Sequence, residues 1–573
     1  MIIGLDVGGT HTDVVLIGDG CIRRQVKVVT DPSNLFESVW AGLDEALRGV
    51  EHGRLRRIVL STTLTTNCLV ERKFAEPGVI VVSGPGMDAE HFRMGPFYSV
   101  VSGSIDHRGR EVQTIDGAEV ELVASRLKSE GVRQVAVVGK FSVRNPIHEL
   151  QVRESLGDDF DYVVLGHRLS GSLNFPRRIA TAYLNAAVYP THSRFYEAVR
   201  SSLRQKGLDI PIHLLKADGG TMSLDASLDN PGQTMLSGPA ASVMGALPFA
   251  SEREETLVLD IGGTTTDMAV LIQRAPLLDP LGIELGGTKT LIRALKTRSI
   301  GLGGDSAVRV ENSRIVIGPH RDGPAMAYGG TVPTPTDALF VLGKMDGGDI
   351  EAARMGILSI AGSMGLGGEE AASLIFDAAC RIILDEAAQM IADINSRPVY
   401  TVHELMEGHQ VRPSEVLVLG GPAPHFGLRL AALTDFDVRV VPRWQVANAI
   451  GAALARTTSE VAVFADTERG LCISPGEDYR QPVPRDFERR GALEVARRLL
   501  RERHLREGGT DEDVEMEVVE DSEFSMVRDF YMTGRNIRVK VQVKPGLIPE
   551  YRAVAEALFK GCTVPGGDEV SRS

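Results

Sequence analysis

The stretch Leu257–Met268, LVLDIGGTTTDM, decides the fold expected of this chain. Apolar residues lead into Asp260, and a glycine pair and three threonines separate it from Asp267 and a second apolar run. Short apolar runs on either side of a glycine turn predict a β-hairpin. Glycine lets backbone N–H groups approach an anion, and a carboxylate at the end of a buried strand can hold a hard cation. The stretch therefore predicts a hairpin whose tip approaches a charged ligand.

The chain opens with a second copy of this pattern. Residues 1–13 read MIIGLDVGGTHTD, so Asp6 and Asp13 repeat Asp260 and Asp267 at one constant offset. A single glycine-rich hairpin is equally compatible with a tight turn beside a packed aspartate. Two copies predict two related half-domains that face one another across a cleft. Such a cleft suits a polyphosphate that carries Mg²⁺.

The paired hairpins resemble the phosphate-binding hairpins of the actin, hexokinase and heat-shock chaperone ATPase superfamily. Within it the chain resembles the hydantoinase A/5-oxoprolinase family, which includes ATP-dependent N-methylhydantoinases and subunits of related ketone carboxylases. The resemblance covers roughly residues 1–455. Five further segments carry it: Ser61–Lys73, Leu236–Ala246, Gly301–Ser306, Tyr328–Leu342 and Val416–Leu433.

The resemblance implies a nucleotide site with ATP and Mg²⁺ as cofactors. The residues expected to bind nucleotide are Gly8, Gly9, Thr10, Gly262, Gly263, Thr264, Gly303, Gly304, Gly420 and Gly421. Asp6 and Asp260 are expected to hold Mg²⁺ through water. Asp13 and Asp267 are the candidate catalytic carboxylates; they either brace the hairpins or, for Asp13, orient a nucleophile. A plain β-turn remains the alternative for the glycines at 303–304.

The expected fold is α/β, with two actin/hexokinase-like lobes that close over MgATP. Residues 1–180 are expected to form the N-terminal lobe with an α/β subdomain inserted at about 75–165, and residues 181–455 the second lobe. Residues 456–573 are expected to form a C-terminal α+β accessory region for docking or oligomerisation. Small-residue helices at 237–245 and 447–455 are expected to cross between the lobes as a hinge, although ordinary packed helices have the same pattern.

Composition and charge narrow the functional classes. A chain of 573 residues has room for two to four domains. The net charge of −14 argues against general nucleic-acid binding. No apolar run approaches the roughly 20 residues of a membrane span, and Met1 leads into a strand without a signal peptide. Five widely spaced cysteines without a CxxC pair are typical of a cytoplasmic protein with reduced thiols.

The resemblance implies ATP-dependent ring opening of a cyclic amide such as 5-oxoproline or a hydantoin. Phosphorylation of the amide oxygen would make the carbon electrophilic, and water would then open the ring. Two alternatives remain open: an ATP-hydrolysing subunit of a ketone carboxylase, and an ATP-driven conformational or reactivating protein. A B-type partner subunit or a homo-oligomer is the expected assembly, with a small-molecule substrate and neither nucleic acid nor membrane as partner.

Two sequence features concern the substrate. The family usually has His-Gly before its threonine cluster, whereas this chain has Leu60-Ser61. That difference removes a possible metal ligand or acid–base group. His167, Arg168 and Arg177 are candidate substrate-site residues, because they precede or begin a helix after a predicted buried strand.

Overall fold

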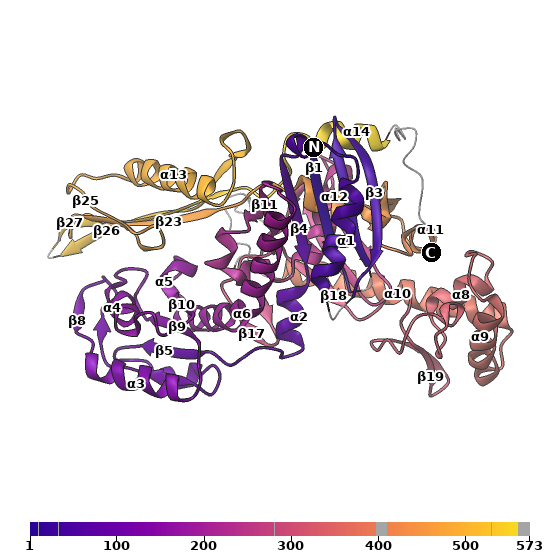
Figure 1. Ribbon diagram of the computed structural model, residues 1–573, viewed down its shortest axis with the longest axis horizontal. Coiled ribbons are helices and arrows are strands. Elements are labelled where there is room, and N and C mark those ends of the chain that lie inside the picture. Colours follow the sequence, from indigo (N-terminus) through magenta and orange to yellow (C-terminus); the bar gives the residue numbers. More distant parts are fainter. Residues whose placement is uncertain (10, 32–33, 280, 397–409, 529, 560–573) are drawn as a thin grey trace.

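The structure is a computed structural model that describes residues 1–573 except 10, 32–33, 280, 397–409, 529 and 560–573. Two mixed β-sheets lie at its centre, with helices around them (Figure 1). Further α/β and α+β units extend from this centre to both ends of the long axis. Among the described residues, no helix has both the length and the apolar character needed to cross a membrane.

The first lobe is built on a sheet with the strand order β12-β11-β4-β1-β2-β3. Strand β1 is antiparallel to β2 and parallel to β4, and its apolar side chains are buried on both faces. Helix α1 packs on it, and the C-terminal part of α6 shares its hydrophobic core. The bounds are β1 Ile2–Val7, β2 His11–Gly18, β3 Cys21–Val29, β4 Arg57–Thr62, β11 Ile212–Leu215, β12 Thr221–Ser223, α1 Leu35–Leu47, α2 Leu64–Val70 and α6 Phe175–Gln205.

The second lobe repeats this arrangement. Strand β13 is antiparallel to β14 and parallel to β21, in the sheet order β15-β14-β13-β21-β22, and β18 also pairs with β14. Each of the two sheets thus has six strands, because short strands extend its edges. The bounds are β13 Glu255–Ile261, β14 Thr266–Ile272, β15 Ala275–Pro276, β18 Thr297–Ile300, β21 Glu415–Leu419, β22 Asp437–Val440, α8 Pro335–Val341, α9 Ile350–Met364, α10 Gly368–Asn395 and α11 Ala423–Leu433.

Two helices of small residues, α7 (Ser237–Ala246) and α12 (Ala447–Leu454), pack against each other between the sheets. One hydrophobic core contains both helices together with apolar residues of the two sheets. A Cβ built on Gly245 would lie 2.3 Å from the Ala447 carbonyl oxygen, and one on Gly451 would lie 2.3 Å from the Gly245 nitrogen. Glycine therefore allows the two backbones to touch, as the sequence predicts for a crossing. Gly238 has room for a side chain, because its nearest neighbour would be a Thr63 methyl 3.9 Å away.

A four-stranded sheet with the order β10-β9-β5-β6 is inserted into the first lobe. Its described pairings are all parallel, and helices cover it as the predicted α/β subdomain requires. The bounds are β5 Gly78–Val82, β6 Tyr98–Val100, β9 Gln134–Gly139, β10 Tyr162–Leu165, α3 Gly117–Ser129, α4 Ile147–Leu156 and α5 Gly166–Leu169.

The C-terminal region is a five-stranded antiparallel sheet, β25-β24-β23-β27-β26, packed against α13. Its entry and exit lie side by side, because the Arg456 N–H donates to Gly546 and the Ile548 N–H to Leu454. Helix α14 then packs back on β3. The bounds are β23 Glu460–Asp466, β24 Leu471–Ser474, β25 Tyr479–Pro482, β26 Met516–Arg528, β27 Tyr531–Val543, α13 Arg489–Arg506 and α14 Tyr551–Phe559.

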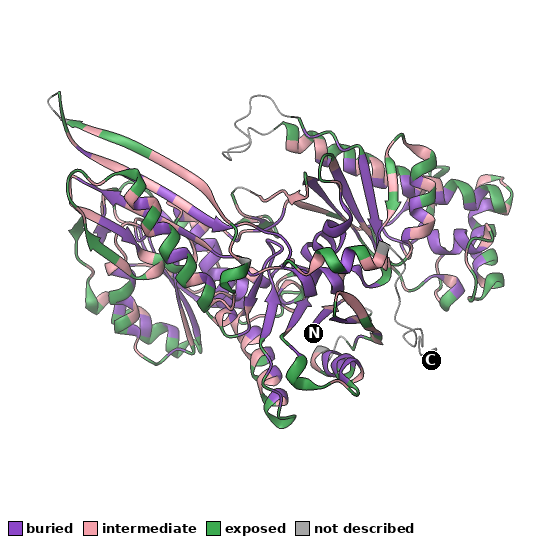
Figure 2. Cartoon of the chain, turned by 90° about the horizontal axis from the view of Figure 1, so that it is seen from above, coloured by how far each residue is buried: buried purple, intermediate pink, exposed green. Residues whose placement is uncertain are grey.

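Strands β26 and β27 form a long two-stranded arm that extends away from the rest of the molecule (Figure 2). Apolar side chains near its end are exposed, among them Phe524, Val527, Phe530, Tyr531 and Met532. Large apolar side chains that gather on an exposed surface mark an interaction site more often than isolated ones do.

Candidate active site

The two glycine hairpins have the same geometry. In the first, Asp6 is paired with Asp13 and the Gly8 N–H donates to the His11 carbonyl at 3.0 Å. In the second, Asp260 is paired with Asp267 and the Gly262 N–H donates to the Thr265 carbonyl at 2.9 Å. The repeat seen in the sequence is therefore a repeat of strand register and turn. Thr10 lies outside the described residues.

One amide connects the two hairpins. Asn448, at the start of α12, donates from Nδ2 to Asp260 Oδ2 at 3.2 Å, and the Ser242 hydroxyl donates to the same oxygen. Asn448 also hydrogen-bonds with Asp6, where its contact lowers the pKa of that carboxyl. The carboxylates of the two lobes therefore meet at a single side chain on the crossing helix.

The buried carboxylates fit a site for a cation and phosphate. Burial is the main cause that raises the pKa of Asp6 to about 7, and the charges of Asp13 and Asp260 act in the same direction. Burial also raises the pKa of Asp260. Carboxylates taken out of water in this way favour a nearby positive charge. No group of three or more His, Cys, Asp or Glu side chains in the described part of the chain is placed to enclose a metal ion.

The two candidate catalytic carboxylates differ in their surroundings. Asp13 forms an ion pair with Lys27 at 2.7 Å, and burial raises its pKa while Lys27 lowers it. Asp267 lies beside the neutral Ser299, and burial together with Asp260 raises its pKa to about 7. Its Oδ1 atom is buried and makes no hydrogen bond with a described residue. Asp267 is therefore the less neutralised of the two, while the catalytic role of either one stays a prediction.

The glycines predicted to bind nucleotide fall into two groups. Gly303 and Gly304 pack beneath the second hairpin: the Gly304 N–H donates to Gly262 at 2.9 Å, and a Cβ on Gly303 would lie 2.5 Å from the Gly262 oxygen. Gly420 has φ +93°, and a Cβ there would lie 2.5 Å from Asp260 Oδ1. Gly421 has open space around its Cα. Of Gly303, Gly304, Gly420 and Gly421, the last is the one with open space for a ligand, and nucleotide binding by all four stays a prediction.

The second hairpin tip has an additional cation beside it. Arg321 donates from Nη1 to the Thr264 hydroxyl at 3.2 Å and forms an ion pair with Asp305 at 3.0 Å. A Cβ on Gly263 would lie 2.9 Å from the same carboxylate. The Arg321 guanidinium is therefore placed to neutralise negative charge on a ligand near Thr264.

Leu60 and Ser61, which stand where the family usually has His-Gly, lie on the strand next to the first hairpin. Leu60 is buried in the core of the first lobe, and Ser61 lies on β4 directly beside Asp6. A hydroxyl thus stands next to the carboxylate, where it lowers the pKa of Asp6 against the effect of burial. The threonines that follow tie α2 to the loop before α7: the Thr66 hydroxyl accepts from the Leu236 N–H at 2.9 Å.

Sequence reasoning missed Asn448 and Ser242. Both lie in helices that were interpreted only as small-residue crossings. A usable signal was present, because Asn448 is the only side-chain amide in ANAIGAALA. An amide in a buried helix needs a hydrogen-bond partner, although nothing near Asn448 in the sequence identifies Asp260 as that partner.

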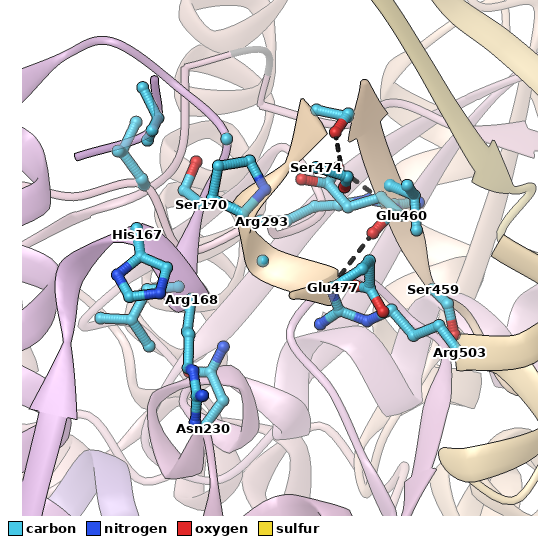
Figure 3. Close-up of a pocket in the computed structure, with 18 of the residues that line it drawn as sticks. His167, Arg168, Ser170, Asn230, Arg293, Ser459, Glu460, Ser474, Glu477 and Arg503 are labelled. Carbon is cyan, nitrogen blue, oxygen red and sulfur yellow. Dashed lines mark hydrogen bonds and ion pairs between the residues drawn. The ribbon is translucent and has the colours of Figure 1, made fainter. Parts of the chain in front are cut away.

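His167 and Arg168, two of the three candidate substrate residues, line a polar pocket between the inserted subdomain, the first lobe and the C-terminal sheet (Figure 3). Arg177 does not line this pocket; it donates to the backbone oxygens of Leu281 and Thr290. The pocket contains no hairpin residue. It is therefore a second site, separate from the two hairpins.

Two sheets with repeated glycine hairpins and small-residue helices crossing between them define a two-lobed α/β fold of the actin and hexokinase type, as predicted. The chain belongs to the hydantoinase/oxoprolinase family. The family models for the hydantoinase/oxoprolinase N-terminal region and for hydantoinase/oxoprolinase match residues 2–159 and 178–461.

Three similar proteins show the range of this family. The acetophenone carboxylase gamma subunit of Aromatoleum aromaticum is 27% identical over 83% of this chain and 70% of its own length. The caprolactamase alpha subunit of Pseudomonas jessenii is 23% identical over 77% of this chain and 68% of its own. The solved nucleotide-free acetone carboxylase superposes with a TM-score of 0.70 at 18% identity, covering 96% of this chain and 88% of that one. This last likeness shows the fold, including the C-terminal sheet.

Proposed function

We propose that this chain is the ATP-cleaving subunit of an enzyme that opens a cyclic amide ring, with MgATP bound between the two hairpins. The observation that carries the proposal is that Asn448 contacts Asp6 and Asp260 at once, so that two carboxylates and two glycine turns converge on one place. Membership of the hydantoinase/oxoprolinase family supports the amide substrate, and the caprolactamase relative supports ATP dependence.

Each residue at the hairpins has a definite task in this proposal. The backbone N–H groups of Gly9 and Gly263 and the hydroxyl of Thr264 would face phosphate oxygens. Asp6 and Asp260 would hold Mg²⁺ through water, and Arg321 would add a positive charge near Thr264. When bound, MgATP supplies a phosphoryl group that turns the amide oxygen into a leaving group. The protein's own contribution is positioning and charge neutralisation, which dominate phosphoryl transfer.

A partner subunit completes the proposal. The two curated relatives described above are a gamma and an alpha subunit. The exposed apolar end of the β26–β27 arm offers a surface for a B-type partner.

Carboxylation is the second candidate, because both the acetophenone and the acetone enzymes act as carboxylases. Phosphate release from the purified chain, alone and with a co-expressed B-type partner, separates the candidates. Stimulation of at least tenfold by 5-oxoproline or hydantoin without bicarbonate is expected. Stimulation that needs both bicarbonate and a ketone would favour the carboxylase. If no cyclic amide stimulates phosphate release by the complete assembly, the amide proposal is wrong. The Asp260→Asn variant provides the background rate of phosphate release.

A further inference from the structure

The polar pocket of Figure 3 lies where three parts of the chain meet. His167 on α5 belongs to the inserted subdomain, Lys216 and Asp218 follow β11 of the first lobe, and Glu460 begins β23 of the C-terminal sheet. The cavity measures about 80 Å³. On the scale where one water needs roughly 10–15 Å³, this holds on the order of six waters. The pocket therefore has room for a small organic molecule.

Two buried polar atoms of this pocket have no hydrogen-bond partner among the described residues. His167 is 1% exposed, and its Nδ1–H donates to Glu149 at 2.5 Å, a carboxylate that also accepts from the backbone N–H groups of Gly139 and His167. The opposite ring nitrogen, Nε2, is buried and makes no hydrogen bond with a described residue. The same holds for Asn230 Oδ1. Buried polar atoms are almost always hydrogen-bonded. With Nδ1 carrying the proton that faces Glu149, a neutral His167 presents Nε2 as an acceptor, and Asn230 Oδ1 is a second one, so both call for a ligand with N–H or O–H donors.

Two of the pocket's cations, Arg144 and Arg293, are incompletely paired among the described residues, whereas its carboxylates are paired with other side chains or hydrogen-bonded. Six arginine and lysine side chains face four carboxylates in the lining. Arg144 stacks 3.3 Å from the centre of the Phe464 ring and forms no ion pair within the described part of the chain. Burial lowers its pKa to about 10, which leaves it charged at neutral pH. Arg293 reaches Asp218 and Glu460 only at 3.5 and 3.8 Å, and its Nε and Nη2 atoms are buried without a hydrogen bond.

The carboxylates are already neutralised by other residues. Glu460 pairs with Lys540 at 2.8 Å, and Glu477 and Glu507 both bind Arg503, at 3.0 and 2.8 Å. Asp218 accepts from the Thr458 hydroxyl and the Gly220 N–H. The unsatisfied charge of the pocket is therefore positive. An unpaired buried cation is costly, and a bound carboxylate would relieve that cost.

We propose that this pocket binds a small substrate that bears both a carboxylate and an N–H donor. Arg144 and Arg293 hold the carboxylate, and His167 Nε2 and Asn230 Oδ1 accept hydrogen bonds from the rest of the molecule. The inference rests on the proposed function, since it specifies which cyclic amides the enzyme takes.

The position of the pocket in the sheet agrees with this role. Strands β1, β4 and β11 are parallel neighbours with β4 in the middle. The segment after β11 and Asp6 on β1 therefore lie at the same, C-terminal end of these strands. Neighbouring strands are 4.7–4.9 Å apart, so two strand spacings place the segment after β11 about 10 Å from Asp6. The pocket thus adjoins the end of the first lobe at which the phosphate hairpin is found.

Calorimetry on the full chain with two probes tests the proposal directly. 5-Oxoproline carries a carboxylate on a lactam ring, and 2-pyrrolidinone is the same ring without it. We expect 2-pyrrolidinone to bind at least tenfold more weakly than 5-oxoproline. Arg144→Met should weaken 5-oxoproline binding at least tenfold and leave 2-pyrrolidinone binding unchanged. Arg126→Gln is the matched control, because Arg126 lies on α3 of the same inserted subdomain but is exposed and does not line the pocket; its effect should stay below threefold.

A second variant protects the test against misfolding. Asn230→Asp keeps the size of the side chain and should weaken only the carboxylate-bearing probe, while MgATP affinity stays unchanged in both pocket variants. Equal affinities for the two probes, no detectable 5-oxoproline binding, or an Arg144→Met variant that binds 5-oxoproline like the wild type would each overturn the proposal.

The outcome separates this inference from the proposed function. If both lactams stimulate ATP cleavage equally, cyclic-amide hydrolysis stands and the carboxylate site is wrong. If 5-oxoproline binds in an Arg144-dependent manner but no cyclic amide stimulates cleavage, the pocket stands and the amide reaction is wrong.

Discussion

Replacing Gly245 by alanine should weaken the crossing of α7 and α12 measurably. The added Cβ would lie 2.3 Å from the Ala447 carbonyl oxygen, about 1 Å short of ordinary contact at 3.4 Å. The obstructing atom is backbone, so a helix must move. Overpacking of this kind costs about 1–3 kcal/mol, and the better helix propensity of alanine returns up to about 1 kcal/mol. Taking the upper figure for a backbone clash gives a net loss of about 2 kcal/mol.

The matched control is Gly238→Ala on the same helix. Its Cβ would meet only a methyl group 3.9 Å away, so the change should be neutral or slightly stabilising. A loss of about 2 kcal/mol in a lobe-sized cooperative unit lowers Tm by about 4–8 °C. Thermal scanning of both variants checks the stability. Small-angle scattering with and without MgATP checks whether the Gly245 variant still becomes more compact. Equal Tm values and equal compaction in the two variants would show that the close crossing has no energetic role.

Three other predictions concern the cation site, acid stability and the arm. Asp260→Asn keeps the size of the side chain but removes its charge, so calorimetry should show at least a tenfold loss of the Mg²⁺-dependent part of ATP affinity; unchanged affinity and turnover would remove Asp260 from the metal site. Burial lowers the pKa of His192 and of His213 to about 4, against 6.5 when unfolded. Protonation therefore favours unfolding, and stability that is complete above pH 6.5 should fall towards pH 4, by up to about 3 kcal/mol per histidine. Denaturant titrations at several pH values should show a shallower fall in His192→Gln, and an identical fall would contradict the assignment. Replacing exposed Phe530 and Tyr531 by serine should reduce co-purification with a B-type partner without changing Tm; undiminished co-purification would exclude the end of the arm.

The hairpins were predictable because their chemistry is local. Apolar runs, a glycine pair and an aspartate at fixed spacing determine strand, turn and register within a dozen residues, and the Asp6–Asp13 and Asp260–Asp267 pairings follow from that spacing. The close helix crossing was predictable for a similar reason, since runs of glycine and alanine allow two helix backbones to approach closely. Strand β18 and the length of α6, which continues past Pro190 to Gln205, were not predicted, because tertiary packing decides them.

The site beyond the hairpins depends on residues far apart in the sequence. Asn448 reaches Asp260 across 188 positions, and no local pattern records that contact. The pocket brings Arg144 onto Phe464 of the C-terminal sheet, so its character appears only when two separate units meet. The sequence singled out His167 and Arg168, which do line the pocket, but it left the C-terminal region without a chemical role.

The paired strands where the C-terminal sheet begins and ends have a topological consequence. Arg456 is hydrogen-bonded to Gly546, and Ile548 to Leu454. The two segments that lead into and out of the sheet, called its stems here, are therefore joined to each other, and the sheet is an insertion rather than a C-terminal tail. Helix α14 continues beyond the stems and returns to β3. A chain cut within the sheet would keep both fragments joined, and a short linker between the stems would remove the sheet together with its hydrogen bonds to the first lobe, such as the one from the Ser223 N–H to the Glu507 carbonyl. The C-terminal sheet, which supplies Glu460 and Phe464 to the pocket, can therefore be replaced as one unit by the corresponding sheet of a relative without a change to the hairpins.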